Sequence, residues 1–133
     1  MIYLVLNKFF EFNELVELGK IFMNCEAYLI ALEHFDKALK LSYLPINRNR
    51  LLEAYDCRGN SKIFLNDYRG AIIDYTRAID INSTDPFLFF WRGFAYEALK
   101  EYEEAIKDFK ISLKIDPDFE FAKTILDHIE NKY

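Results

Sequence analysis

The side chains that most often perform catalysis are few in this chain, and their spacing predicts no active site. The 133 residues include two histidines, His34 and His128, and two cysteines, Cys25 and Cys57. Neither histidine stands at metal-ligand spacing from a cysteine, and the HExxH, GxxxxGK(S/T), GxSxG and GxGxxG motifs are absent. Cys57 has no base near it in the sequence, which indicates a groove or core thiol. We therefore expect no enzymatic activity, no metal and no cofactor.

The charged residues are arranged as on a solvated surface. Glu103 and Lys107, for example, stand four residues apart on one helix face, the spacing of an exposed ion pair. Lys and Arg total 17 and Asp and Glu total 22, so the net charge is −5. A mildly acidic chain lacks the basic face that duplex nucleic acid or an anionic membrane would need. We therefore expect neither nucleic acid nor membrane as a partner.

The start of the chain and the cysteines favour a cytoplasmic protein. The apolar run Met1–Leu6 is too short for a signal peptide or a membrane span, and the charge of Lys8 interrupts the apolar pattern. Two cysteines without a pairing pattern are typical of a reduced compartment.

An internal repeat supplies the elements that would carry any site. A shift of 34 residues places Gly59 on Gly93 and Ala71 on Ala105, and a shift of 40 places Gly19 on Gly59. The six additional residues form an insertion between the first two copies. The resulting units are an N-terminal flank 1–11, repeats 12–45, 52–85 and 86–119, an insertion 46–51, and a capping segment 120–133.

Each repeat reads as two helices. Phe89, Gly93 and Tyr96 recur at spacings of four and three on one helix face, and Asp85-Pro86 is a helix start. The recurring glycines and alanines indicate that the two helices approach closely, because a glycine inside a helix otherwise costs about 1 kcal/mol. The insertion should lengthen the next helix to about 17–20 residues, capped by Asn47 and ending near Leu65.

The sequence predicts the structure of the C-terminal flank more clearly than that of the N-terminal flank. The capping segment carries an apolar stripe that should cover the last repeat. Its members are Phe121, Ile125, Leu126 and Ile129. In the N-terminal flank Ile2, Leu6 and Phe10 are four apart and fit a helix, although an extended segment folded onto the array is the alternative. Because this flank is apolar, either this chain or a neighbour should cover it.

The repeated residues resemble the tetratricopeptide repeat, a 34-residue helix–turn–helix unit. The third unit carries the family pattern with Phe89, Gly93, Tyr96, Ala105, Phe109 and Pro117, and with Ser112 in place of the second alanine. The second unit departs at Lys62, where a large residue is usual, and at Ser83, where proline is usual. The resemblance implies an all-α fold, a right-handed α-α superhelix (solenoid) of antiparallel helix pairs.

The resemblance also implies a binding surface, because the first helices of such repeats line a concave groove that binds peptides or proteins. Carried over to this sequence, the peptide-binding candidates are Phe87, Phe90, Trp91, Phe94, Asn60, Cys57, Asp56 and Phe64. The equivalent face of the first repeat holds Asn13, Val16, Lys20, Met23 and Asn24, and Glu53 lies beside the second set. The alternative is that the aromatic residues of the third unit are core.

One subgroup of the family clamps chaperone C-terminal carboxylates with Lys, Asn and Arg side chains. The corresponding positions here are Val16, Lys20, Cys57, Phe87 and Trp91. Because most of these are apolar, we do not expect a chaperone tail as the ligand.

Two functions fit this pattern. The first is a non-enzymatic interaction module that binds an apolar or amphipathic peptide or helix of a protein partner in the aromatic groove. The alternative is a structural scaffold that assembles with itself, through the same aromatic face or through the N-terminal flank.

Overall fold

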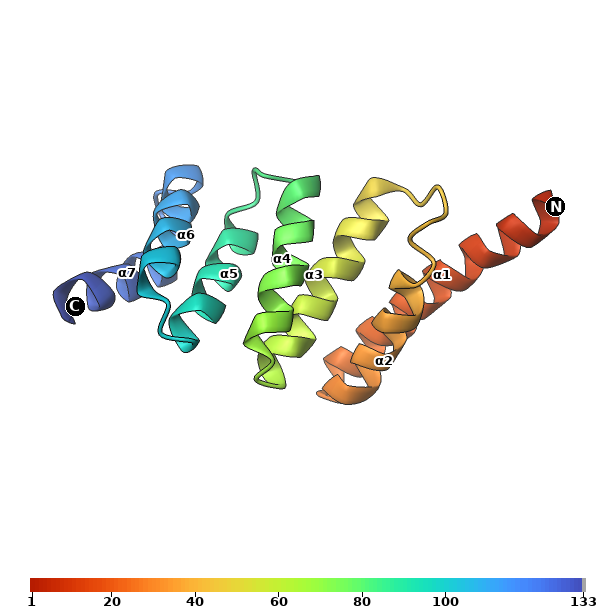
Figure 1. Ribbon diagram of the computed structural model, residues 1–133, viewed down its shortest axis with the longest axis horizontal. Helices are drawn as coiled ribbons and strands as arrows, with labels where there is room; N and C mark the ends of the chain where they lie inside the picture. Colours follow the sequence, from red (N-terminus) through yellow and green to blue (C-terminus); the bar gives the residue numbers. More distant parts are fainter. Residues whose placement is uncertain (133) are drawn as a thin grey trace.

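Seven helices follow one another in a row, and the two ends of the chain lie at opposite ends of that row (Figure 1). The computed structural model describes residues 1–132. The helices are α1 (Ile2–Asn24), α2 (Tyr28–Leu39), α3 (Arg48–Phe64), α4 (Tyr68–Ile81), α5 (Pro86–Ala98), α6 (Tyr102–Ile115) and α7 (Glu120–Lys132). Each helix contacts the next, which gives three antiparallel pairs with α7 packed on α6. The all-α fold expected from the repeat is confirmed.

The same backbone turn joins the helices of every pair. Glu26, Asn66 and Lys100 occupy one repeat position, and each has a left-handed φ of 60° or 61°. In each turn the next residue donates its N–H to the carbonyl five residues earlier, as Ala27 does to Phe22 at 2.9 Å. This Schellman-type end satisfies carbonyls that a helix terminus would otherwise leave unpaired.

The close helix approach predicted from the glycines is present. A Cβ on Gly19 would lie 2.6 Å from Cε1 of Phe35, and one on Gly59 would lie 3.0 Å from Cζ of Tyr75. Glycine therefore allows an aromatic ring of the second helix to sit directly on the backbone of the first.

The inserted segment contributes to a regular helix. The first residue of α3 is Arg48, and the helix is 17 residues long with Leu65 as its C-cap, as expected. The side chain of Asn47 caps it by accepting a hydrogen bond from the N–H of Asn49 at 2.9 Å.

A buried ion pair joins the two helices of the second and of the third repeat, and its arginine also contacts the preceding repeat. Asp74 is fully buried and accepts hydrogen bonds from Arg58 Nε at 2.9 Å and Nη2 at 2.7 Å. Lys62 Nζ lies 3.0 Å from the same carboxylate, and Arg58 also reaches Asp36 of the preceding repeat at 3.1 Å. Lys62 stands where the resemblance predicts a large residue, and its ammonium group forms an ion pair with Asp74. Arg92 repeats the arrangement with Asp108 and Thr76.

The capping helix has a different buried face from the one the sequence predicts. Ala122, Leu126 and Ile129 are buried against the α6 side, whereas Phe121 is 73% exposed. The predicted stripe is therefore wrong at Phe121, because its side chain points away from the packed face.

The N-terminal flank is helical, so the extended alternative is wrong. It forms the first turns of α1, which project beyond the rest of the row (Figure 1). No helix among residues 1–132 is long and apolar enough to cross a membrane.

Candidate functional site

An aromatic hollow lies where the start of α5 meets the start of α7. Its volume is about 290 Å³. Five side chains line it: Phe87, Phe90, Trp91, Phe119 and Phe121. The rings of Phe87 and Phe119 are 4.9 Å apart, and Phe87 is 55% exposed. The hollow is thus a surface of open aromatic rings around a packed floor.

The candidate aromatic residues of α5 divide into two groups. Phe90 is only 7% exposed, and its ring packs 5.8 Å from Phe109 and 4.9 Å from Phe119. Phe90 therefore lies in the floor of the hollow rather than on its open surface, because α6 and the chain leading into α7 cover most of its ring, and its part in peptide binding stays a prediction. Trp91 and Phe94 are half-buried and meet edge to face at 5.7 Å.

The candidates on α3 are mostly occupied by other contacts. Asn60 accepts a hydrogen bond from the Tyr75 hydroxyl at 2.8 Å. Phe64 is 57% exposed, but its ring stacks on Tyr28 at 4.4 Å. Cys57 is buried, and burial together with the nearby Asp56 raises the pKa of its thiol to about 12. Cys57 therefore stays protonated and is no nucleophile.

Asp56 is the chemically unusual group of this face. Burial, with further contributions from Asp85 and Glu53, raises the pKa of its carboxyl to about 6. Its neighbours Cys57 and Tyr75 are neutral, because burial raises the pKa of both. Asn60 Nδ2 offers a long hydrogen bond of 3.4 Å to Asp56 Oδ1. Since no cation within residues 1–132 forms an ion pair with it, the Asp56 carboxylate would gain from a positively charged or hydrogen-bond-donating ligand group.

We expect Asp56→Asn to stabilise the protein at neutral pH. Between about pH 4 and pH 6 the folded state holds a proton that the unfolded state has released, so the wild-type free energy of unfolding falls as pH rises. At pH 7 the variant should gain about 1–3 kcal/mol, and near pH 3.8 this gain should vanish. Urea unfolding at several pH values measures the difference. The exposed Asp127→Asn should match wild type throughout, and equal stability of Asp56→Asn and wild type at pH 7 would contradict the prediction.

At the other end of the groove, α1 and α3 are joined by a network of four charges. Lys20 Nζ lies 2.6 Å from Glu53 Oε1 and 3.4 Å from Glu17 Oε2. Arg50 contacts Glu53 and lies 2.9 Å from Glu17 Oε1. Hydrogen bonding by Glu53 raises the pKa of Lys20, and hydrogen bonding by Arg50 lowers the pKa of Glu17. Both cations are therefore already neutralised by carboxylates of the chain.

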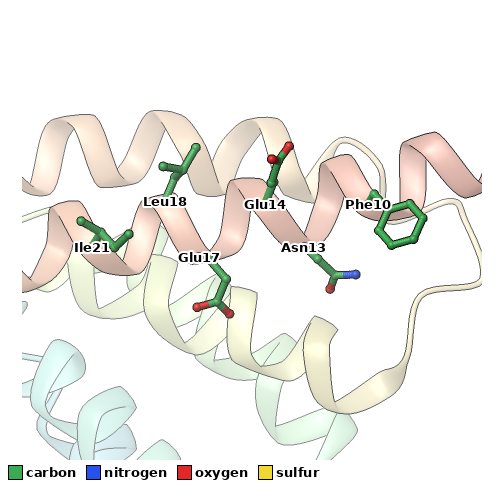
Figure 2. A pocket seen from close by; sticks show the side chains of 6 residues that line it. All are labelled: Phe10, Asn13, Glu14, Glu17, Leu18 and Ile21. Carbon is green, nitrogen blue, oxygen red and sulfur yellow. The ribbon is translucent and has the colours of Figure 1, made fainter.

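A shallow hollow of about 520 Å³ runs along the outside of α1. Figure 2 shows that Asn13 and Glu17 point toward α3, whereas Glu14 and Leu18 lie on the other side of α1. Val16, a candidate for the groove, is instead fully buried. The hollow thus lies along α1 beside the place where Asn13 and Glu17 meet Arg50 of α3, a tertiary contact that sequence spacing does not report.

No catalytic constellation is evident in the described part of the chain. His34 is in α2 and bonds the Ile30 carbonyl at 2.8 Å, while His128 is in α7. Among residues 1–132 no three His, Cys, Asp or Glu side chains are grouped as metal ligands would be.

Comparison with known sequences identifies the family of one of the repeats. The tetratricopeptide repeat family matches residues 86–119. Small glutamine-rich tetratricopeptide repeat-containing protein 2 of Saccharomyces cerevisiae is 37% identical over 62 residues, 47% of this chain and 18% of that protein. Hsp70-Hsp90 organizing protein 2 of Arabidopsis thaliana is 32% identical over 62 residues, 47% of this chain and 11% of that protein. The chain thus spans less than a fifth of either relative.

Solved structures share the whole architecture. The crystal structure of MamA superposes with a TM-score of 0.83 at 23% identity, over 91% of this chain and 67% of that one. The first tetratricopeptide domain of Spaghetti (RPAP3), bound to the HSP90 peptide SRMEEVD, gives 0.80 at 23% identity, over 93% and 94%. The repeat spacing, the three helix pairs with a capping helix, and these matches agree: residues 86–119 form a tetratricopeptide repeat, and the whole chain has the fold of these solved structures.

Proposed function

We propose that the chain is a non-enzymatic protein–protein interaction module whose groove binds an apolar or amphipathic segment of a partner protein. The observation that carries this proposal is the open aromatic hollow. Phe87 and Phe121 are 55% and 73% exposed above the buried rings of Phe90 and Phe119. Large exposed aromatic side chains on a firm, packed floor are the typical anchors of a binding site.

The charged residues of the groove favour a ligand that carries a positive rather than a negative side chain next to its apolar residues. Asp85 caps α5 two residues before Phe87, and it is near enough to Asp56 to raise the pKa of that carboxyl. Asp85 therefore adds a carboxylate at the start of α5, next to Phe87, and Asp56 of α3 lies near enough to be repelled by it. The cations Lys20 and Arg50 are engaged by Glu17 and Glu53. A lysine or arginine of the ligand would relieve the repulsion between Asp56 and Asp85.

The relatives correct the exclusion of chaperone tails. The RPAP3 domain holds an acidic HSP90 peptide in the same fold, and one relative is an Hsp70-Hsp90 organizing protein. An acidic C-terminal tail therefore remains a candidate ligand, although in this chain it would compete with Glu53 for Lys20.

Ligand binding in the hollow can be followed by fluorescence, because Trp91, the single tryptophan of the chain, lines the hollow. We would titrate the full chain with three peptides and record Trp91 fluorescence. The first is an amphipathic helix with apolar residues at i, i+3, i+4 and i+7 and one lysine, the second is its scrambled polar version, and the third is SRMEEVD. Saturable binding of the first peptide alone supports the proposal. Preference for SRMEEVD would instead assign a chaperone-tail site.

We expect Phe87→Ala and Phe121→Ala each to weaken binding of the amphipathic peptide about tenfold or more, since aromatic anchors contribute about 2 kcal/mol. Their melting temperatures should stay close to wild type, because both rings are largely exposed. Tyr43→Ala is a matched aromatic control, because Tyr43 is 74% exposed and lies outside the hollow, and this variant should bind normally. Equal weakening by all three variants would show that the hollow is not the binding site.

A further inference from the structure

A hollow that contains two arginines lies at one edge of the second repeat, where the start of α3 meets the end of α4. These two helix ends lie at the same edge of the row because α3 and α4 are antiparallel (Figure 1). The hollow has a volume of about 260 Å³. Its lining combines charged, aromatic and aliphatic side chains: Arg48, Arg77, Asp80, Tyr55, Leu51 and Ile81.

The two arginines of this hollow differ from the other arginines of the chain. Each of the other four forms an ion pair with an aspartate or glutamate of the chain; these are Arg50, Arg58, Arg69 and Arg92. Within residues 1–132 neither Arg48 nor Arg77 forms an ion pair or a side-chain hydrogen bond. Two guanidinium groups with free N–H donors therefore meet at one small hollow.

The packing of the repeats does not account for this pair of arginines. Arg48 belongs to the insertion 46–51, which interrupts the 34-residue period between the first two copies. The position of Arg77 is held by Lys37 in the first repeat and by Ile111 in the third. The two arginines are thus a feature of the second repeat alone, whereas residues that pack the helix pairs recur from copy to copy.

We propose that this hollow, which we call the arginine hollow, binds one oxyanion, a carboxylate or phosphate group on a side chain of a partner protein. The planar N–H donors of two guanidinium groups match the oxygen atoms of one such group. The half-buried Tyr55, Leu51 and Ile81 would contact the apolar neighbours of that side chain. This inference does not rest on the proposed peptide site, because the aromatic hollow is built by α5 and the start of α7.

The charge of the arginine hollow suits a single anionic side chain. Asp80 lines the same hollow and offsets one of its two positive charges, although within residues 1–132 it forms no ion pair with either arginine. Nucleic acids bind through many phosphates and need a wider basic surface. A chain of net charge −5 with one small arginine hollow offers no such surface, so the charges favour a protein ligand.

The first test is a nuclear magnetic resonance titration of the isotope-labelled full chain, followed through the Nε–H signals of its arginines. The probes are three peptides Ala-Leu-X-Leu-Ala, in which X is phosphoserine, glutamate or serine. We expect saturable shifts of the Arg48 and Arg77 signals with phosphoserine, glutamate or both, and none with serine. The tighter of the two anionic peptides identifies the source of the oxyanion. Absence of shifts with both anionic peptides, or tighter binding of a short single-stranded RNA, would overturn the proposal.

Variants of the hollow test the role of each charge. Arg48→Gln and Arg77→Gln should each weaken binding of the tighter peptide at least about threefold, because each removes a charge-assisted hydrogen bond. Asp80→Asn should strengthen binding about two- to threefold, because it removes a like charge from the site. Arg69→Gln is the matched control, since Arg69 is an exposed arginine of α4 outside the hollow. Circular dichroism should show wild-type helix content in all four variants. Equal weakening by Arg69→Gln, or unchanged binding by Arg48→Gln and Arg77→Gln, would overturn the proposal.

Discussion

Deleting the chain from Glu120 onward should lower the free energy of unfolding by about 3–5 kcal/mol, out of a total of about 5–15 kcal/mol for a domain of this size. Leu126 and Ile129 are 7% and 1% exposed, and burying each such side chain is worth about 1.5–3 kcal/mol before ordering entropy is subtracted. The deletion would also uncover Phe109 and Phe90, which share one core cluster with them. The truncated chain should therefore unfold at lower urea concentration and aggregate on heating.

Point variants of the full chain separate lost packing from truncation itself. Leu126→Asp with Ile129→Asp should reproduce most of the loss, because two charges would enter the packed face of α7. His128→Ala with Asp127→Ala changes exposed residues of the same helix and should stay within about 0.5 kcal/mol of wild type. If the truncated chain unfolded at the wild-type urea concentration, α7 would not be a structural cap.

The helix pairs were predictable because each pair packs in the same way. Gly19 and Gly59 recur where an aromatic ring of the partner helix needs room, so the shift of the sequence on itself reports the packing directly. The cap of α3 was predictable for a local reason, since Asn47 bonds to a backbone N–H only two residues away. Features fixed by neighbouring backbone or by the repeat geometry are therefore readable from sequence.

The buried face of α7 and the aromatic anchors of α5 were not predictable in this way. Apolar residues occur on more than one side of α5, so spacing alone does not decide which ring is covered. Phe90 is buried and Phe87 is open because of where Phe119 and the start of α7 lie. That placement depends on how α7 crosses α6, which no repeat of the sequence reports.

The charge network of the groove was also outside the reach of sequence spacing. Lys20 and Glu53 are 33 residues apart and meet only because α1 and α3 lie side by side. Their contact changes the chemistry of the groove, since a lysine that would otherwise attract an acidic ligand is already paired. Ligand preference thus depends on tertiary contacts, whereas the presence of a groove follows from the repeat.

Asp74→Ala should destabilise the protein by about 3–5 kcal/mol, because it leaves buried cations without their carboxylate. Asp74 is fully buried, and it pairs with both Arg58 at 2.7 Å and Lys62 at 3.0 Å. Asp36→Ala removes the exposed end of the same network and should cost less than about 1 kcal/mol, since surface ion pairs contribute little. Urea unfolding at pH 7 measures both.

A second series distinguishes loss of an ion pair from loss of packing. Lys62→Leu introduces a large residue, which is what the resemblance leads us to expect at this position, and it removes one of the two cations. Adding Lys62→Leu to Asp74→Ala should therefore recover part of the lost stability, because one fewer charge is left buried without a partner. If the free energy of unfolding lost in the double variant equalled the sum of the losses in the two single variants, the cost of Asp74→Ala would lie in the packing around Asp74. Recovery of about 1 kcal/mol or more would instead show that Lys62 and Asp74 are coupled.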